Sequence, residues 1–113
     1  MQVSTWPIII DDRDKMQIFA RVISDQFSLK IITSIINNPK TAVVIAKETN
    51  IPISTVYRRL QFLQENKLVK VSGDINKDGK FFLYQSKIKE IEITFDGKSM
   101  KVSVIPNLNF TVK

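Results

Sequence analysis

The chain of 113 residues contains no cysteine and no histidine. Without cysteine there are no disulfides and no thiolate ligands, and without histidine there are no imidazole ligands. Catalysis by a histidine base or a cysteine nucleophile is excluded for the same reason. The acidic run at residues 11–14 stands where a helix is expected to begin, and acids there complement the helix dipole. We therefore expect no enzyme, no metal site and no cofactor.

Long apolar runs are also missing. No stretch approaches the roughly 20 apolar residues that a membrane-spanning helix needs, so we expect no membrane partner. The first residues lack the basic and then apolar layout of a secretory signal peptide. An apolar content of 43% and a charged content of 25% are typical of a folded protein, and the length suits one domain over residues 1–113. We expect a cytoplasmic location.

Acidic side chains are scarce in one third of the chain. Residues 54–89 hold eight basic and three acidic side chains, whereas residues 1–53 hold six and five, and residues 90–113 hold three of each. Most of the net charge of +6 therefore belongs to the middle segment. Such a segment indicates a polyanionic partner, and a solvated basic face is the other interpretation.

The pattern of apolar residues predicts two helices after an extended arm at residues 1–11. The first covers residues 12–23, where apolar side chains recur at helical spacing. Ser24 or Asp25 can cap the second, which we expect to end near Asn37, before a proline.

A helix-turn-helix is predicted at residues 41–66. Thr41 can cap a short third helix, and Asn50 follows it, where a left-handed residue often ends a helix. Ser54 can cap a fourth helix that runs to about Asn66. A helix-turn-helix lays its second helix in a DNA groove, so this segment indicates nucleic-acid binding.

The fourth helix divides into two sides on a helical wheel. We expect one side to be buried, and it consists of Val56, Leu60, Leu63 and Lys67. Four residues of the N-terminal half can point outward: Thr55, Tyr57, Arg58 and Gln61. Arginine pairs with guanine, glutamine with adenine, and threonine with a thymine methyl group or a phosphate. We predict Arg58 as the base contact.

Three neighbours on this helix have other predicted roles. Ser54, with the first backbone N–H groups, can hold a phosphate. Arg59 lies nearer the buried side, and we predict a contact with phosphate or sugar rather than with a base. Phe62 lies opposite the buried side, where a large apolar side chain should not face water. It either packs under the wing or against the first helices, which we favour, or lines a dimer contact.

The chain after Asn66 changes to strand-like patterns. Short strands at residues 68–71 and 81–84 flank a long polar loop, so residues 68–86 form a predicted hairpin wing. Lys77 and Lys80 lie at or near its tip, and Lys70 lies in its first strand. We predict that these three lysines contact DNA phosphates.

A second hairpin is predicted within residues 88–113. Ile91, Ile93 and Phe95 alternate before an Asp96–Gly97 turn, and apolar residues alternate again from Met100. The tail from residue 106 either forms an edge strand or docks on a partner. The predicted fold class is thus α+β, with about four helices, a β-hairpin wing and a second C-terminal β-hairpin.

The sequence resembles the ArsR-like class of winged helix-turn-helix transcriptional regulators, and its archaeal members in particular. The motifs that carry the resemblance are Val22–Asp25, Leu29–Ile32, Ile45–Ala46, Ile53–Leu60, Leu63, Leu68–Val69, Tyr84–Ile88 and Ile91–Gly97. The resemblance covers about residues 12–97. It implies a homodimer that binds a near-palindromic site on double-stranded DNA. Metal sensing does not carry over, because that activity uses cysteine and histidine ligands.

The hypothesis from the sequence is therefore a sequence-specific, DNA-binding transcriptional regulator that acts as a homodimer. The alternative is a winged-helix module for protein–protein interaction within a larger assembly. That alternative predicts no sequence preference for DNA and a dependence on Trp6, Phe62 or the tail. The sequence names no small-molecule effector.

Overall fold

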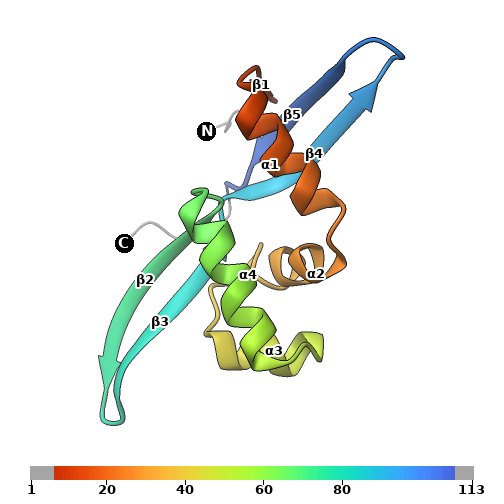
Figure 1. Cartoon of the computed structure of the whole chain (residues 1–113). Helices are drawn as coiled ribbons and strands as arrows, with labels where there is room; N and C mark the ends of the chain where they lie inside the picture. Colours follow the sequence, from red (N-terminus) through yellow and green to blue (C-terminus); the bar gives the residue numbers. More distant parts are fainter. Residues whose placement is uncertain (1–6, 109–113) are drawn as a thin grey trace.

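The computed structural model describes residues 7–108, with residues 74 and 76 described in their backbone only. These residues form an α+β structure of four helices and five strands, and its layout is compatible with a winged helix (Figure 1). The elements are β1 (Ile8–Ile10), α1 (Arg13–Ile23), α2 (Gln26–Ser34), α3 (Ala42–Thr49), α4 (Ile53–Glu65), β2 (Val69–Asn76), β3 (Gly79–Ser86), β4 (Ile88–Phe95) and β5 (Met100–Pro106).

Side-chain caps set the starts of the first three helices. The sequence predicted the caps of α2 and α3, whereas Asp12 was expected as the first residue of its helix and instead caps α1. The carboxylates of Asp12 and Asp25 and the hydroxyl of Thr41 each accept a backbone N–H from the first turn that follows. Asp25, and not Ser24, is the cap of α2. Asn50 adopts the predicted left-handed conformation after α3, with φ of 59°. These boundaries depend on residues within one helical turn, and they can therefore be predicted from the local sequence.

The end of α2 differs from the prediction. The helix stops at Ser34 rather than near Asn37. The Ile35 carbonyl accepts the backbone N–H of Ser86 at 2.9 Å, so a distant strand uses an acceptor that a longer helix would bond internally. Tertiary hydrogen bonds therefore end this helix early.

Asn107 joins three parts of the chain. Its side chain is buried and donates from Nδ2 to the carbonyls of Ile36 and Ser86, both at 2.7 Å. Its backbone N–H donates to the Lys87 carbonyl at 2.9 Å. The end of α2, the end of β3 and the residue after β5 are thereby held together at the junction between the two hairpins.

The β2–β3 hairpin is longer than predicted. Its antiparallel register runs from Val69 opposite Ser86 to Asn76 opposite Gly79. Only Lys77 and Asp78 remain as the turn, so most of the polar segment that we assigned to a loop is strand. Gly79 has φ of 115°, a backbone conformation that residues with a Cβ rarely adopt.

A second sheet has the strand order β1–β5–β4. The predicted hairpin of β4 and β5 is confirmed, with Ile93 opposite Val102 and Phe95 opposite Met100. Part of the predicted N-terminal arm is a strand, because β1 pairs with β5 and places Ile10 opposite Val102. Residues 1–6 of the arm, including Trp6, and the tail from residue 109 lie outside the described residues.

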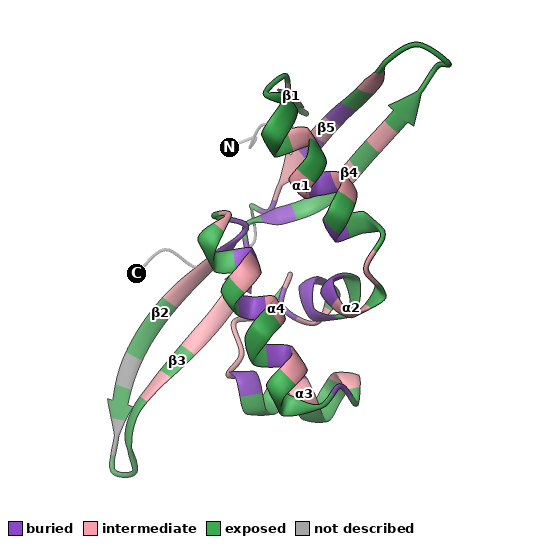
Figure 2. Cartoon of the chain, in the orientation of Figure 1, coloured by how far each residue is buried: buried purple, intermediate pink, exposed green. Residues whose placement is uncertain are grey.

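The core lies where the helices meet each other and the roots of the hairpins, and the far ends of both hairpins are exposed (Figure 2). The buried apolar residues are Phe19, Val22, Ile31, Ile32, Ile35, Ala42, Ile45, Ile51, Val56, Leu60, Leu63, Leu68, Val69, Ile88, Val102 and Val104. The described part measures 55 × 39 × 21 Å and is thus elongated and flat. The two hairpins extend from it in opposite directions (Figure 1).

Candidate nucleic-acid interface

The fourth helix begins earlier than predicted. Its first residue is Ile53, its N-cap is Pro52, and no side chain caps it. The prediction of Ser54 as the cap is therefore wrong, and Ser54 lies in the first turn with its side chain exposed. The fixed φ of proline suits the position before a helix, so Pro52 can start α4 without a polar cap. The first N–H groups of α4 consequently have no side-chain acceptor.

One side of α4 is buried almost as predicted. Val56, Leu60 and Leu63 are at most 1% exposed. Lys67 is the exception and corrects the prediction, because it is exposed and lies beyond the end of the helix with φ of 62°. A left-handed residue after a helix leaves the helical wheel, so the predicted spacing does not apply to it.

Three of the four residues predicted to point outward are exposed, and Ser54, which was predicted as the cap, is exposed beside them. Ser54, Tyr57, Arg58 and Gln61 are exposed and recur at spacings of three, one and three, so they form a single stripe along α4. We call these four residues the α4 stripe. Thr55 is half-buried at its side, and its hydroxyl lies 3.4 Å from Nη2 of Arg58. The stripe combines a guanidinium, a carboxamide and two hydroxyls, which can all hydrogen-bond to base edges or phosphates.

Arg59 lies outside this stripe and is ion-paired. Its Nε donates to Oδ2 of Asp25 at 2.6 Å, and Nη2 lies 3.5 Å from Oδ1. Partial burial by itself raises the pKa of Asp25, but hydrogen bonds from Arg59 and Ser28, with the charge of Arg59, lower the pKa overall. The pair fixes α4 against the turn between α1 and α2. Sequence spacing could not identify this partner, which is 34 residues away.

Phe62 packs against the first helix, which is the alternative that we favoured. The ring is half-buried, and the guanidinium carbon of Arg21 lies 4.3 Å from its centroid. A cation over an aromatic face is stabilising, and the ring is also packed against the hydrophobic core. Arg21 is thus a basic residue beside α4 that the sequence analysis did not single out.

The β2–β3 hairpin lies beside the other edge of the α4 stripe. Burial raises the pKa of Tyr84 in β3, and the nearby Tyr57 of α4 raises it further. Lys40, before α3, pairs with Tyr84 through two backbone hydrogen bonds of 2.8 and 3.0 Å. The hairpin root is therefore held on both sides, by α4 and by the α2–α3 connection.

The predicted lysines of the hairpin do not share one face. Tyr84, Phe82 and Lys80 alternate along β3 and so project from the same face, the one nearer to α4. Lys77 is exposed in the turn at the tip. Lys70 precedes Val71, the partner of Tyr84, and therefore projects from the opposite face. Of the three predicted lysines, Lys80 thus lies on the face nearer to α4, Lys77 lies at the tip, and Lys70 lies on the opposite face.

Two apolar residues of the hairpin were missed. Ile75 is 75% exposed and Phe82 is 47% exposed, on the same face as Lys80. The amino group of Lys80 lies 5.3 Å from the centre of the Phe82 ring. The correct strand register would have identified this mixed basic and apolar face, but the predicted strands included Phe82 and left Ile75 and Lys80 in the loop.

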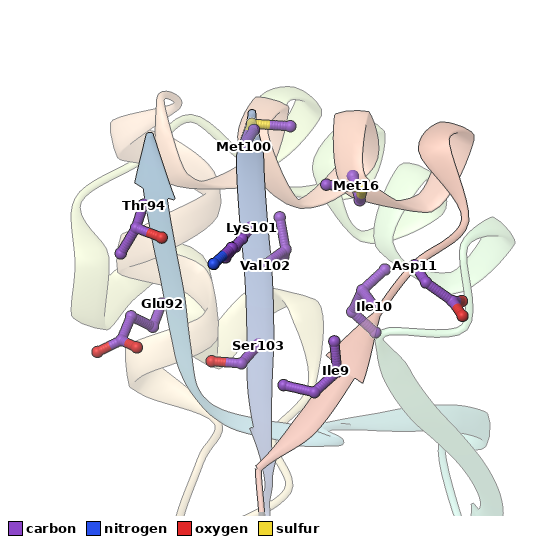
Figure 3. A pocket seen from close by; sticks show the side chains of 10 residues that line it. All are labelled: Ile9, Ile10, Asp11, Met16, Glu92, Thr94, Met100, Lys101, Val102 and Ser103. Atoms are coloured by element: carbon purple, nitrogen blue, oxygen red, sulfur yellow. The ribbon is translucent and has the colours of Figure 1, made fainter. Parts of the chain in front are cut away.

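A different surface lies on the β1–β5–β4 sheet. A hollow of about 440 Å³ is lined there by residues that include Ile9, Glu92, Thr94, Lys101 and Ser103 (Figure 3). Ile9 is 70% exposed, and Phe95, at the end of the hairpin, is 71% exposed. The register places Ile9, opposite Ser103, and Phe95, opposite Met100, on different faces of the sheet, so the hollow combines the exposed Ile9 with charged groups, and Phe95 lies apart from it.

Within residues 7–108, no helix is long and apolar enough to cross a membrane. The same part of the chain holds no group of three or more acidic side chains placed to bind a metal ion. No family model matches the sequence, and no similar protein is found among the curated proteins or the solved structures. A function is therefore inferred from the geometry of α4 and the β2–β3 hairpin.

Proposed function

We propose that the protein is a DNA-binding transcriptional regulator with a winged helix-turn-helix fold of the ArsR-like class. In this proposal α3 and α4 are the helix-turn-helix, and the β2–β3 hairpin is the wing. The α4 stripe enters the major groove, while Lys77 and Lys80 contact phosphates beside it. The observation that carries the proposal is the polar and basic α4 stripe, which lies opposite a fully buried side of the same helix.

Charge supports the same proposal. Within the described chain the exposed part of α4 carries Arg58 near its uncapped N-terminus, where the helix dipole also favours an anion. The wing adds Lys77 at the tip and Lys80 on the near face. A groove helix flanked by basic groups is the arrangement that draws a protein to a phosphate backbone.

The proposal includes a homodimer. One groove helix contacts only a few base pairs, so a specific site usually requires a second copy on the adjacent half-site. The outer face of the β1–β5–β4 sheet is our candidate for the dimer contact, because it exposes Ile9 and combines acidic and basic side chains. Two such faces related by a twofold axis can pair Glu92 of one copy with Lys101 of the other.

Selection of bound duplexes from a random DNA pool tests the proposal directly. We expect a near-palindromic consensus, and we expect Arg58→Ala to weaken binding to it by about 1–3 kcal/mol and to relax one base position. Arg58→Lys is the matched control, since it keeps the charge but loses the bidentate fork, and it should retain binding to random duplex. If Arg58→Ala binds the selected site like the wild type, α4 is not the base-contacting helix.

The second candidate function is a protein-interaction module. It is favoured by the hollow of Figure 3 and by the exposed Ile9 and Phe95. In that case the selection would return no consensus, and binding to random duplex would be weak at physiological salt. The two functions are thus separated by one experiment.

A further inference from the structure

A pocket of about 360 Å³ lies between the α1–α2 turn and α4. Three arginines line it, Arg21 from α1 and Arg58 and Arg59 from α4, together with Phe62, Asp25 and two serines. The pocket lies along the edge of the α4 stripe that carries Arg58. Tyr57 lies on the other edge of the stripe, next to Tyr84 of the wing. The wing and the pocket therefore flank α4 on opposite sides.

The pocket carries unbalanced positive charge. Among the residues that line it, Asp25 is the one acid against three arginines. The carboxylate of Asp25 already accepts Nε of Arg59 at 2.6 Å, the Ser28 hydroxyl at 2.6 Å and the Ser28 backbone N–H at 3.3 Å. The negative charge of Asp25 thus offsets the positive charge of Arg59. The guanidinium groups of Arg21 and Arg58 have no acid beside them in the lining, so the pocket has a local excess of two positive charges.

Two of the arginines are held in place before any ligand arrives. The guanidinium of Arg21 stacks on Phe62 with 4.3 Å from its carbon to the ring centroid, and that of Arg59 lies 5.5 Å from the Phe27 centroid. Stacking uses the face of a guanidinium and leaves the N–H groups at its edge able to donate. In Arg59 the Nε–H and one Nη2 N–H already face Asp25, so the remaining Nη groups are the ones that can donate to a ligand. Planar groups of this kind match the oxygens of a phosphate, and fixing them beforehand reduces the entropy lost on binding.

We propose that this pocket is a phosphate-binding site in which Arg21 and Arg59 grip the anion and Arg58 stands at its border. The proposal rests on the proposed function for its occupant, which is a backbone phosphate of the DNA strand on the side of α4 away from the wing. A free phosphate has the same chemistry, so the experiment treats the two sources separately.

The first measurement is the affinity for a random duplex as a function of salt, followed by fluorescence anisotropy. Arg21 is exposed, so Arg21→Ala should fold normally, and we expect it to weaken binding about five- to tenfold. It should also reduce the slope of log affinity against log salt by about 0.9, the value for one lost phosphate contact. Lys98→Ala is the matched control, because it removes one exposed positive charge at the end of the β4–β5 hairpin and should change neither quantity.

Phe62 is a positioning residue in this scheme. Phe62→Leu keeps an apolar side chain but loses the aromatic face, so we expect a smaller loss of affinity in the same direction as Arg21→Ala. Phe62→Tyr keeps the face and should restore wild-type binding. A merely structural role of Phe62 would not depend on the aromatic ring once thermal unfolding shows that both variants are folded.

The second measurement titrates inorganic phosphate into the wild-type protein and follows the arginine Nε–Hε resonances by NMR. We expect those of Arg21 and Arg59 to shift, and the shift to be absent for Arg59 in Arg21→Ala. If phosphate shifts these resonances but no duplex binds, the pocket stands as a site for a free phosphate and the proposed function fails. If DNA binds but Arg21→Ala matches Lys98→Ala in affinity and slope, or if phosphate shifts neither arginine, the phosphate site is refuted.

Discussion

At the residue scale, Asp25 combines three roles. It caps α2, accepts the hydroxyl of Ser28 and holds Arg59 of α4 at 2.6 Å. Both partners of the ion pair are mostly covered, with 32% of the Arg59 side chain and 25% of the Asp25 side chain exposed. Partly covered ion pairs contribute more to the free energy of unfolding than fully exposed ion pairs, because solvent screens their charges less. The ion pair that holds α4 in position therefore depends on whether the Asp25 carboxylate is ionised.

The free energy of unfolding should depend on the protonation of Asp25. Because the folded pKa of Asp25 is lowered, its contribution is present above the unfolded pKa of about 3.9 and is lost as the pH falls through the folded pKa. Asp25→Asn should keep the helix cap but lose the charge, and lower the free energy of unfolding by about 1 kcal/mol at neutral pH. Urea denaturation from pH 7 down to pH 2 measures this difference, which should shrink in acid.

Asp11→Asn is the control for that experiment, because Asp11 is exposed and lies before the Asp12 cap of α1. It changes the net charge by the same amount without touching Arg59. A difference between wild type and Asp25→Asn that persists unchanged at pH 2 would mean that the ion pair does not stabilise the fold.

At the scale of elements, the β2–β3 hairpin shows how pairing can override local preference. Gly73, Asp74 and Asn76 have low strand propensity, and the sequence therefore predicted a loop. In the structure they lie opposite Phe82, Phe81 and Gly79, so the strand continues almost to the tip. A strand is stabilised by its partner across the ladder, and a partner is not visible in a local window.

The register of this hairpin gives the prediction for the wing. Lys77→Ala and Lys80→Ala should each weaken binding to specific and random duplexes by a similar factor. Each should also lower the salt slope by about 0.9, because phosphate contacts carry no sequence information. Anisotropy titrations at several salt concentrations measure both effects. Lys70 projects from the opposite face, so an equal effect of Lys70→Ala would show that the wrong face was assigned to DNA.

At the scale of the whole molecule, the two hairpins extend in opposite directions from the helices (Figure 1). One lies beside α4, and the other carries the exposed sheet face with Ile9 (Figure 3). Under the proposed function, this separation would leave one end for DNA and the other end for a second copy. Two protomers joined at the β1–β5–β4 sheets would present two α4 helices, as a near-palindromic site requires.

The proposed dimer gives a prediction about mass. Light scattering after size exclusion should find twice the 13.0 kDa of the chain. Ile9→Glu should shift the mass toward one chain, because it places a carboxylate in the proposed apolar contact. Ile75→Glu makes the same change on an exposed isoleucine of the other hairpin and should leave the dimer intact. A wild-type monomer at working concentrations would contradict the dimer.

The sequence by itself determined the helix cap at Thr41, the left-handed Asn50 and the β4–β5 hairpin, and it limited the cap of α2 to Ser24 or Asp25. Each of these depends on residues within a few positions, whose chemistry is written in the local sequence. It also indicated the buried side of α4 as far as Leu63, since helical spacing fixes which residues share a face.

Tertiary structure alone decided the partner of Arg59, the stacking of Arg21 on Phe62 and the pairing of β1 with β5. It also decided the early end of α2, where Ser86 takes the Ile35 carbonyl. All of these contacts join residues far apart in the chain, and their geometry exists only when the elements have packed. The absence of cysteine and histidine limits what this protein can do, and the packing around α4 decides which basic groups remain at its surface.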